Sequence, residues 1–198
     1  MSRRRREPPT DRPAESADPE SVVRAILLRR LSAAPRTRGE LEQDLARRGA
    51  DPRVAAAVLD RFEEVGLIDD AAFASSWVES RHRGKALARP VLKRELRTRG
   101  VAPEVIDAAL ASVDDDDEWQ RAREFAHRKA RLKPGEDPRK ATGRLAGQLA
   151  RKGYPAGVCF AVAREALGAV IEQGEHEAVD EVGASVVIDD LPVDQESV

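Results

Sequence analysis

A 19-residue stretch occurs three times in this chain, and the repetition constrains the fold more than any other feature. Residues 41–59 read LEQDLARRGADPRVAAAVL and residues 92–110 read LKRELRTRGVAPEVIDAAL, and the two agree at 8 of 19 positions. A weaker copy, LAGQLARKGYPAGVCFAVA, begins at residue 145. Leu, Leu, Gly, Pro and Val recur in the same order in all three copies, at offsets of 51 and 53 residues. Self-similarity at such a period is typical of repeat proteins.

Each copy predicts two helices joined by a short turn. The two leucines lie four residues apart and therefore share one helix face, and in the first copy Gly49 follows where a left-handed residue ends a helix. Asp51 is a good N-cap for the next helix, with Pro52 at its first position. The second copy has Ala102 in place of Asp51, which predicts a helix without a side-chain cap.

A further helix is predicted ahead of each hairpin. Asp69 and Asp70, and the acidic run at residues 114–117, lie just before two of these helices. We interpret them as helix caps and not as a metal site, because four adjacent carboxylates do not converge on one point. Residues 83–89 and 133–137 are predicted to be loops. The apolar faces of the three leading helices are Val22, Val23, Ile26, Leu27 and Leu31; Phe73, Ala74, Trp77 and Val78; and Trp119, Ala122, Phe125 and Ala126.

We therefore predict an all-α protein of three tandem three-helix repeats that form an elongated, curved array. The repeats are expected at residues 19–68, 69–113 and 114–170. Aromatic residues make up only 4% of the chain, so one repeat buries little apolar surface and neighbouring repeats must cover each other. Residues 1–18, a basic and proline-rich head, and residues 171–198, an acidic tail, are expected to be disordered.

The net charge of −2 conceals an uneven distribution. Residues 19–170 contain 29 basic and 23 acidic residues, a net charge of +6, whereas residues 171–198 contain nine acidic residues and no Lys or Arg. A basic body of this kind suits phosphate groups or an acidic protein surface. The tail either screens this body, lies over it or only keeps the chain in solution.

The sequence offers no catalytic or metal-binding constellation. His82, His127 and His176 lie in different repeats or in the tail and are expected at the surface. Cys159 lies between apolar residues and is expected to be a small core residue, and a single cysteine is consistent with a reducing compartment. We expect no enzymatic activity, no cofactor and no metal. No apolar run is long enough for a membrane span, and we expect a cytoplasmic monomer.

The hairpin also has the outline of a helix-turn-helix, but its second helix has the wrong residues for reading DNA. Early positions of that helix hold Glu104 and Asp107 in the second copy and alanine or glycine in the third. Basic residues gather instead on the first hairpin helix and just before it. Arg89, Lys93 and Arg97 recur every four residues and form a stripe, which is either a working surface or a solvated helix face. The candidate partner-binding residues are Arg81, Arg83, Lys85, Arg89, Lys93, Arg94, Arg97 and Arg99.

The chain resembles the RecX family of bacterial regulatory proteins from about residue 27 to residue 167. The resemblance is strongest over GLIDDAAFA at residues 66–74, Arg81, GKAL at residues 84–87 and LKRELRTRGV at residues 92–101. It is weakest in the third repeat, and the head and the tail lie outside it. RecX-like proteins are built from tandem three-helix repeats.

This resemblance implies a function that composition and periodicity do not. RecX-like proteins dock in the groove of the RecA filament on DNA, limit its growth or stability, and so lower the ATPase, strand-exchange and coprotease activities of RecA. Some members also touch DNA. The resemblance therefore implies a modulator of recombination, DNA repair and the SOS response with the RecA filament as partner. Two other functions remain open: a non-specific DNA-binding protein that competes for the strand, and a helical adaptor for another assembly.

Overall fold

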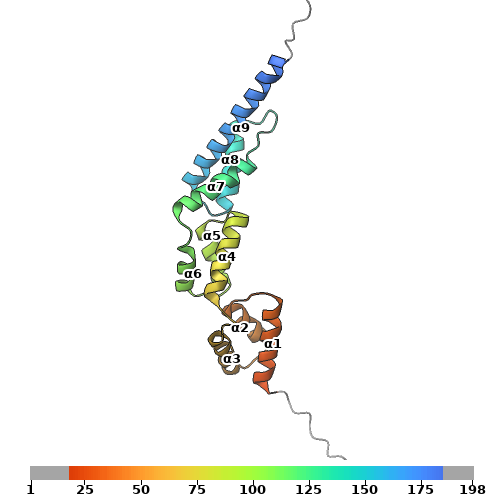
Figure 1. Ribbon diagram of the computed structural model, residues 1–198, viewed down its shortest axis with the longest axis vertical. Coiled ribbons are helices and arrows are strands. Elements are labelled where there is room, and N and C mark those ends of the chain that lie inside the picture. The colour runs from red at the N-terminus through yellow and green to blue at the C-terminus, as the bar shows by residue number, and fades with distance from the viewer. Residues whose placement is uncertain (1–17, 185–198) are drawn as a thin grey trace, which may run out of the picture. The chain divides into compact units, whose positions relative to one another are not determined.

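The structure is a computed structural model, and it describes residues 18–184, with side chains as far as residue 172. Within this range it contains nine α-helices and no strand (Figure 1). The first repeat comprises α1 (Pro19–Ala33), α2 (Arg38–Arg47) and α3 (Pro52–Glu64). The second comprises α4 (Asp70–Lys85), α5 (Arg89–Thr98) and α6 (Pro103–Leu110), and the third α7 (Asp115–Lys129), α8 (Pro138–Arg151) and α9 (Ala156–Ala184). The predicted all-α fold of three three-helix repeats is confirmed.

Most helices begin as the sequence predicts. Asp51 accepts hydrogen bonds from the backbone N–H groups that follow it at the start of α3, and Asp137 does the same at the start of α8. Asp69 and Asp114 likewise cap α4 and α7, each accepting a backbone hydrogen bond of 2.8 Å. Ala102 makes no cap hydrogen bond, also as predicted.

The end of α4 differs from the prediction. Residues 83–89 were expected to form a loop, but α4 continues through Gly84 to Lys85. The residue that reverses the chain is Ala86, which has a left-handed φ of 50°. Ala86 is buried, so packing of its methyl group offsets a conformation that alanine otherwise avoids.

The last helix extends into the acidic segment. Residues 171–198 were expected to be a disordered tail, and α9 continues to Ala184, so it includes the first half of this segment. Residues 171–184 contain four Glu, which is a strong helix former, together with two Gly. The head at residues 1–17 and the end of the tail at residues 185–198 lie outside the described residues, as does the side chain of His176.

The described chain divides into two compact units. One unit contains residues 18–80 and 92–112, and the other contains residues 81–91 and 113–184, so the division passes through α4 and α5. The first unit contains a core between α1, α2 and α3 that includes Leu27, Leu45 and Leu59. The core of the second unit lies between α7, α8 and α9, and Ala86 and Ala88 from the α4–α5 loop contribute to it.

Three side chains test the expectations about burial. Cys159 is buried, as predicted, and its burial raises the pKa of the thiol. Trp119 was expected on a buried helix face, but it is 38% exposed. His82 was expected at the surface, but it is buried and its Nδ1 lies 3.0 Å from the carbonyl oxygen of Leu87. His82 therefore has a structural position in the α4–α5 turn.

Two glycines allow α2 to approach the turn after α5 within the first unit. A methyl group on Gly39 would lie 2.8 Å from the Cα atom of Gly100, closer than such atoms approach in proteins. Gly100 itself has a φ of 78°, so it is required both by its conformation and by this contact. The backbones of repeats one and two therefore meet without intervening side chains.

We predict that Gly39→Ala lowers the free energy of unfolding by about 1–3 kcal/mol, because backbone atoms must move to admit the methyl group. Gly143→Ala in α8 is the matched control, since a methyl group there meets nothing within 4 Å. The control is expected to be neutral or stabilising by up to about 1 kcal/mol through helix propensity. Thermal unfolding followed by circular dichroism measures both, and equal behaviour of the two variants would contradict the close contact.

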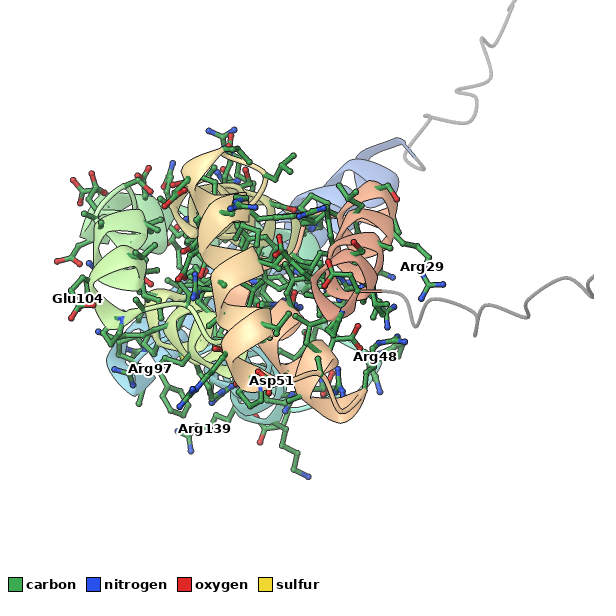
Figure 2. All side chains as sticks on the ribbon, turned by 90° about the horizontal axis from the view of Figure 1, so that it is seen from below. Arg29, Arg48, Asp51, Arg97, Glu104 and Arg139 are labelled. Atoms are coloured by element: carbon green, nitrogen blue, oxygen red, sulfur yellow. The ribbon has the colours of Figure 1, made fainter. Side chains whose placement is uncertain are left out.

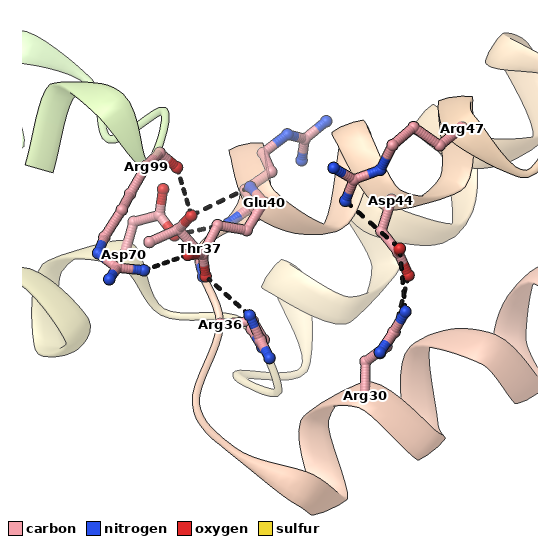
Figure 3. Close-up of polar contacts among 9 residues, drawn as sticks. Arg30, Arg36, Thr37, Glu40, Asp44, Arg47, Asp70 and Arg99 are labelled. Carbon is pink, nitrogen blue, oxygen red and sulfur yellow. Dashed lines mark hydrogen bonds and ion pairs between the residues drawn. The ribbon is translucent and has the colours of Figure 1, made fainter.

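An ion-pair cluster ties α1 to α2 (Figure 3). Asp44 accepts hydrogen bonds of 2.7 and 3.0 Å from Arg30 of α1, and one of 3.2 Å from Arg48. The hydrogen bonds from Arg30 and then from Arg48 lower the pKa of Asp44 from 3.8 to about 2, although partial burial opposes the shift. The carboxylate form of Asp44 therefore stabilises the folded state.

This cluster predicts a pH dependence of stability. Asp44→Asn is expected to lower the free energy of unfolding at pH 7 by about 1–2 kcal/mol, after allowance for partial solvent screening. The Asp44 contribution is complete above its unfolded-state pKa near 4 and is lost as pH falls through about 2, so parent and variant should converge over that window. Chemical denaturation at several pH values measures this.

Glu42→Gln is the control for Asp44→Asn, because Glu42 lies exposed on the same helix and pairs with no described residue. A constant difference between parent and Asp44→Asn from pH 7 to pH 2 would show that the carboxylate is not the stabilising group.

Candidate partner-binding surface

The eight predicted partner-binding cations come from α4, α5 and the turn after α5. The division between the two units passes through this set. Arg81, Arg83, Lys85 and Arg89 belong to the unit of the third repeat, and Lys93, Arg94, Arg97 and Arg99 to the unit of the first. Each group is therefore considered within its own unit.

Arg89 joins α5 to α7 through hydrogen bonds and ion pairs. Its backbone N–H donates to a carboxylate oxygen of Glu118 at 2.6 Å, and its Nε donates to the other oxygen at 3.1 Å. The guanidinium also forms an ion pair with Asp115. Burial opposes the charge, but these two carboxylates outweigh it and raise the pKa of Arg89. The bidentate arrangement fixes the side chain, and so Arg89 stabilises the fold.

Lys93 has a similar role within the second repeat. Its ammonium pairs with the carboxylate of Asp107 and so joins α5 to α6. Because Asp107 comes from the second hairpin helix, this pair explains why that helix has an acidic residue where a DNA-reading helix would have a basic one. Two members of the predicted basic stripe, Arg89 and Lys93, are therefore neutralised by residues of the protein itself.

Arg99 lies at a junction between α2, α4 and the end of α5 (Figure 3). We call this group the α2–α5 junction: Thr37, Glu40, Asp70, Trp77 and Arg99. The guanidinium of Arg99 pairs with Glu40, and its central carbon lies 3.9 Å from the centre of the Trp77 ring. The ion pair and the cation–π contact both lie within one compact unit, and together they fix the guanidinium of Arg99.

The polar groups of the α2–α5 junction complete the start of α2. Thr37 and Glu40 form a capping box, and the hydroxyl of Thr37 donates to the carbonyl oxygen of Arg99. Asp70, the first residue of α4, accepts a 2.8 Å hydrogen bond from the backbone N–H of Arg38. The free N–H groups of α2 are thus satisfied by its own cap and by the second repeat, which joins the two repeats.

The remaining predicted cations are more available to a partner. Arg94 and Arg97 are exposed on α5, and neither forms an ion pair with any described residue. Figure 2 shows Arg97 at the molecular surface. Lys85 is also exposed, whereas Arg81 and Arg83 interact with neighbouring groups. Of the predicted stripe only Arg97 keeps an uncompensated charge, and partner binding by the eight residues stays a prediction.

The described residues offer little for catalysis. No group of three or more His, Cys, Asp or Glu residues is placed to hold a metal ion in the part of the chain described. His127 lies 3.5 Å from Glu165, which Arg123 also binds, so its neighbours are those of a surface ion pair. Among helices of the described range, none combines the length and apolar character needed to cross a bilayer.

The fold and this surface define a helical-repeat protein with exposed cations in its second repeat. Family models match in chain order: the RecX first three-helix domain at residues 24–62, the second at residues 69–110 and the third at residues 115–162. The chain belongs to the RecX family.

Relatives with high sequence identity support this membership. The chain is 50% identical over 159 residues to the regulatory protein RecX of Streptomyces coelicolor. The aligned region covers 80% of this chain and 85% of that protein. It is 45% identical over 160 residues to the regulatory protein RecX of Thermobifida fusca, with coverage of 79% and 86%. These relatives are named regulatory proteins.

A solved structure shows the same fold. The crystal structure of RecX from Lactobacillus salivarius superposes with a TM-score of 0.67 at 21% identity, covering 76% of this chain and 97% of that one. A second crystal structure, of a regulatory protein RecX, gives a TM-score of 0.65 at 22% identity and covers 72% of each chain.

Arg99 belongs to the α2–α5 junction and Arg94 does not, so we expect substitution of these two residues to affect stability differently. Arg99→Gln is expected to lower the free energy of unfolding by about 1–2 kcal/mol, because it removes the Glu40 ion pair and the cation contact with Trp77. Arg94→Gln, five residues earlier on the exposed side of α5, is the matched control and should change stability by less than about 0.5 kcal/mol. Denaturant unfolding measures the difference. If both variants were as stable as the parent, the junction would not hold the repeats together.

Proposed function

We propose that this protein binds the RecA filament on DNA and lowers its growth or stability, thereby reducing the recombinase, ATPase and coprotease activities of RecA. It would act as a cytoplasmic regulator of DNA repair, recombination and the SOS response. The observation that carries this proposal is the match of all three RecX domains, in order and without a missing repeat.

The repeated structure supports the proposal on physical grounds. The chain contains three successive three-helix repeats, so a partner with its own repeating subunits can be contacted by more than one repeat. Contacts that are individually weak then add through effective concentration, because binding by one repeat holds the next near its site. Substantial affinity is thus possible without one large apolar interface.

The exposed cations of the second repeat are the best candidates for part of this interaction. Arg94 and Arg97 are exposed and form no ion pair with a described residue, so a partner carboxylate or phosphate would not compete with an internal acid. Arg89, Lys93 and Arg99 would have to break internal ion pairs first. We therefore expect Arg94 and Arg97 to contribute more to binding than the other three.

The direct experiment is to measure DNA-dependent ATP hydrolysis by RecA during titration with this protein. The proposal predicts that hydrolysis falls at fewer molecules of this protein than of RecA, because blocking one point of a filament affects many protomers. An unchanged rate up to a ratio of one to one would contradict it.

The role of the second repeat is tested by the double variant Arg94→Gln/Arg97→Gln. We expect it to require several-fold more protein for half-inhibition of RecA ATP hydrolysis, while its melting temperature stays that of the parent. Arg29→Gln/Arg53→Gln, which removes two exposed cations of the first repeat that pair with no described residue, is the control of equal charge. Equal inhibition by the parent and by Arg94→Gln/Arg97→Gln would remove these residues from the interface.

A second candidate function is competition for the DNA strand itself. It is favoured by the net charge of +6 between residues 19 and 170. Tight binding to bare DNA with a steep salt dependence, and inhibition only when the DNA is saturated, would favour this function over filament binding.

A further inference from the structure

Repeat two meets repeat one through the turn that joins α5 to α6. The carbonyl oxygen of Arg99, the residue before the turn glycine, accepts a hydrogen bond from the hydroxyl of Thr37. Gly100 follows, and its backbone lies against that of Gly39. One repeat thus offers an edge made of a carbonyl oxygen and a glycine, and the preceding repeat fills this edge with the residues at the start of its middle helix.

Repeat three meets repeat two in the same way. The carbonyl oxygen of Lys152, again the residue before a turn glycine, accepts a 2.9 Å hydrogen bond from the N–H of Ala88. A methyl group on Gly153 would lie 2.7 Å from a side-chain carbon of Val91, so this glycine also adjoins the preceding repeat closely. Each of these residues has a counterpart in the contact between repeats one and two, at the offsets of the three sequence copies. The filled edge is therefore a repeated feature of the fold.

The equivalent edge of repeat one is unfilled, because no repeat precedes it in the described chain. Its turn residues are Arg48 and Gly49, and a methyl group on Gly49 would meet nothing within 4 Å. The carbonyl oxygen of Arg48 accepts no hydrogen bond from a described residue, since the residue four positions later is Pro52, which has no N–H. Val22 of α1, the counterpart of Phe73 beside the filled edge of repeat two, is 43% exposed. We call Val22, Arg48 and Gly49 the open edge.

The segments that fill the other two edges share a short sequence pattern. Residues 37–39 read TRG and residues 88–90 read ARP, so an arginine is followed by glycine or proline. Residues 11–13 of the head read DRP and repeat this pattern. The arginine of the first segment donates its backbone N–H to the first residue of α4, so a segment in the same place on repeat one would lie beside the start of α1. The five Cα–Cα steps from residue 13 to residue 18 span up to about 17 Å, which is enough for this placement.

We propose that residues 11–13 dock on the open edge and take the place that the start of a middle helix takes at the other two edges. The N–H of Asp11 donates to the carbonyl oxygen of Arg48, as at the edge of repeat three, and Pro13 lies beside Gly49. Terminal repeats of such arrays need a cap, because no neighbouring repeat covers their outer surface. The contact lies within one chain, so it goes beyond the proposed function and does not depend on RecA.

The charges of the segment and of the open edge are complementary. The single carboxylate of Asp44 is shared by three arginines: Arg30, Arg47 and Arg48. Positive charge is therefore in excess there, and the carboxylate of Asp11 compensates it on docking. Arg12 lies beside Glu20 in the first turn of α1, just as the first turn of α7 offers carboxylates at the edge of repeat three. Residues 185–198 of the acidic tail also have suitable charge, but they contain no arginine and so lack the repeated pattern.

Paramagnetic broadening in NMR spectra of the full-length protein tests the docking. A nitroxide is attached to Ala46→Cys, at an exposed position of α2 close to the open edge, while the buried Cys159 stays unlabelled. This label should weaken the amide signals of Asp11 and Arg12 several-fold. The control is the same label on Arg97→Cys, the exposed counterpart of Ala46 in repeat two, where the edge is already filled. The control label should leave both signals unchanged.

Two variants of the head, each made in the Ala46→Cys protein, test the segment itself. Arg12→Ala/Pro13→Ala should restore most of the weakened signal, because it removes the repeated pattern. Arg6→Ala/Pro9→Ala removes one arginine and one proline elsewhere in the head and is the matched control. The control variant should keep the broadening seen with the parental head.

Full signals from residues 11–13 with the label near the open edge would overturn the proposal. Equal weakening from both label positions, or equal effects of the two head variants, would overturn it as well. Weakening of signals from residues 185–198 in place of those from residues 11–13 would assign the edge to the acidic tail. Weakening that appears in isotope-labelled protein only after spin-labelled protein is mixed with it would assign the edge to a second copy, and either assignment contradicts the proposal.

Discussion

The unit of the first repeat depends on the contact between the start of α2 and the turn after α5. Gly39 and Gly100 let the two backbones meet. Arg99, which precedes Gly100, forms an ion pair with Glu40 and a cation–π contact with Trp77. The core of the first repeat contains four leucines with Phe62 and Ile68, but a three-helix unit of this size buries limited apolar surface by itself. The junction adds hydrogen bonds between side chains and backbone groups together with charge pairing, and so it joins two repeats within one unit.

The basic residues of α5 and of the turn after it fall into two groups. Arg89, Lys93 and Arg99 each form an ion pair with a carboxylate of another helix of the same chain. Arg94 and Arg97 are exposed and form no ion pair with any described residue, so they are the cations that we propose for partner binding. Because removing an internally paired cation destabilises the fold as well as changing the surface, loss of activity in such a variant does not locate a binding site.

The sequence predicted the local features of the fold well. The repeats, the aspartate caps such as Asp51 and the left-handed turns follow from residue preferences within a few positions, and the structure has them. Features set by distant contacts were not predictable in this way. His82 and the reversal at Ala86 depend on packing in the α4–α5 turn, and the pairing of Lys93 depends on an acid of the next helix.

If the α2–α5 junction joins the first repeat to the second, α2 and α5 open as parts of one cooperative unit. Native-state hydrogen exchange of the backbone amides tests this most directly, in the parent and in Arg99→Gln. We expect the amides of α2 and α5 to exchange with the same opening free energy in the parent, and both to lose protection together in the variant. Different opening free energies for α2 and α5 in the parent, with neither changed by Arg99→Gln, would contradict it.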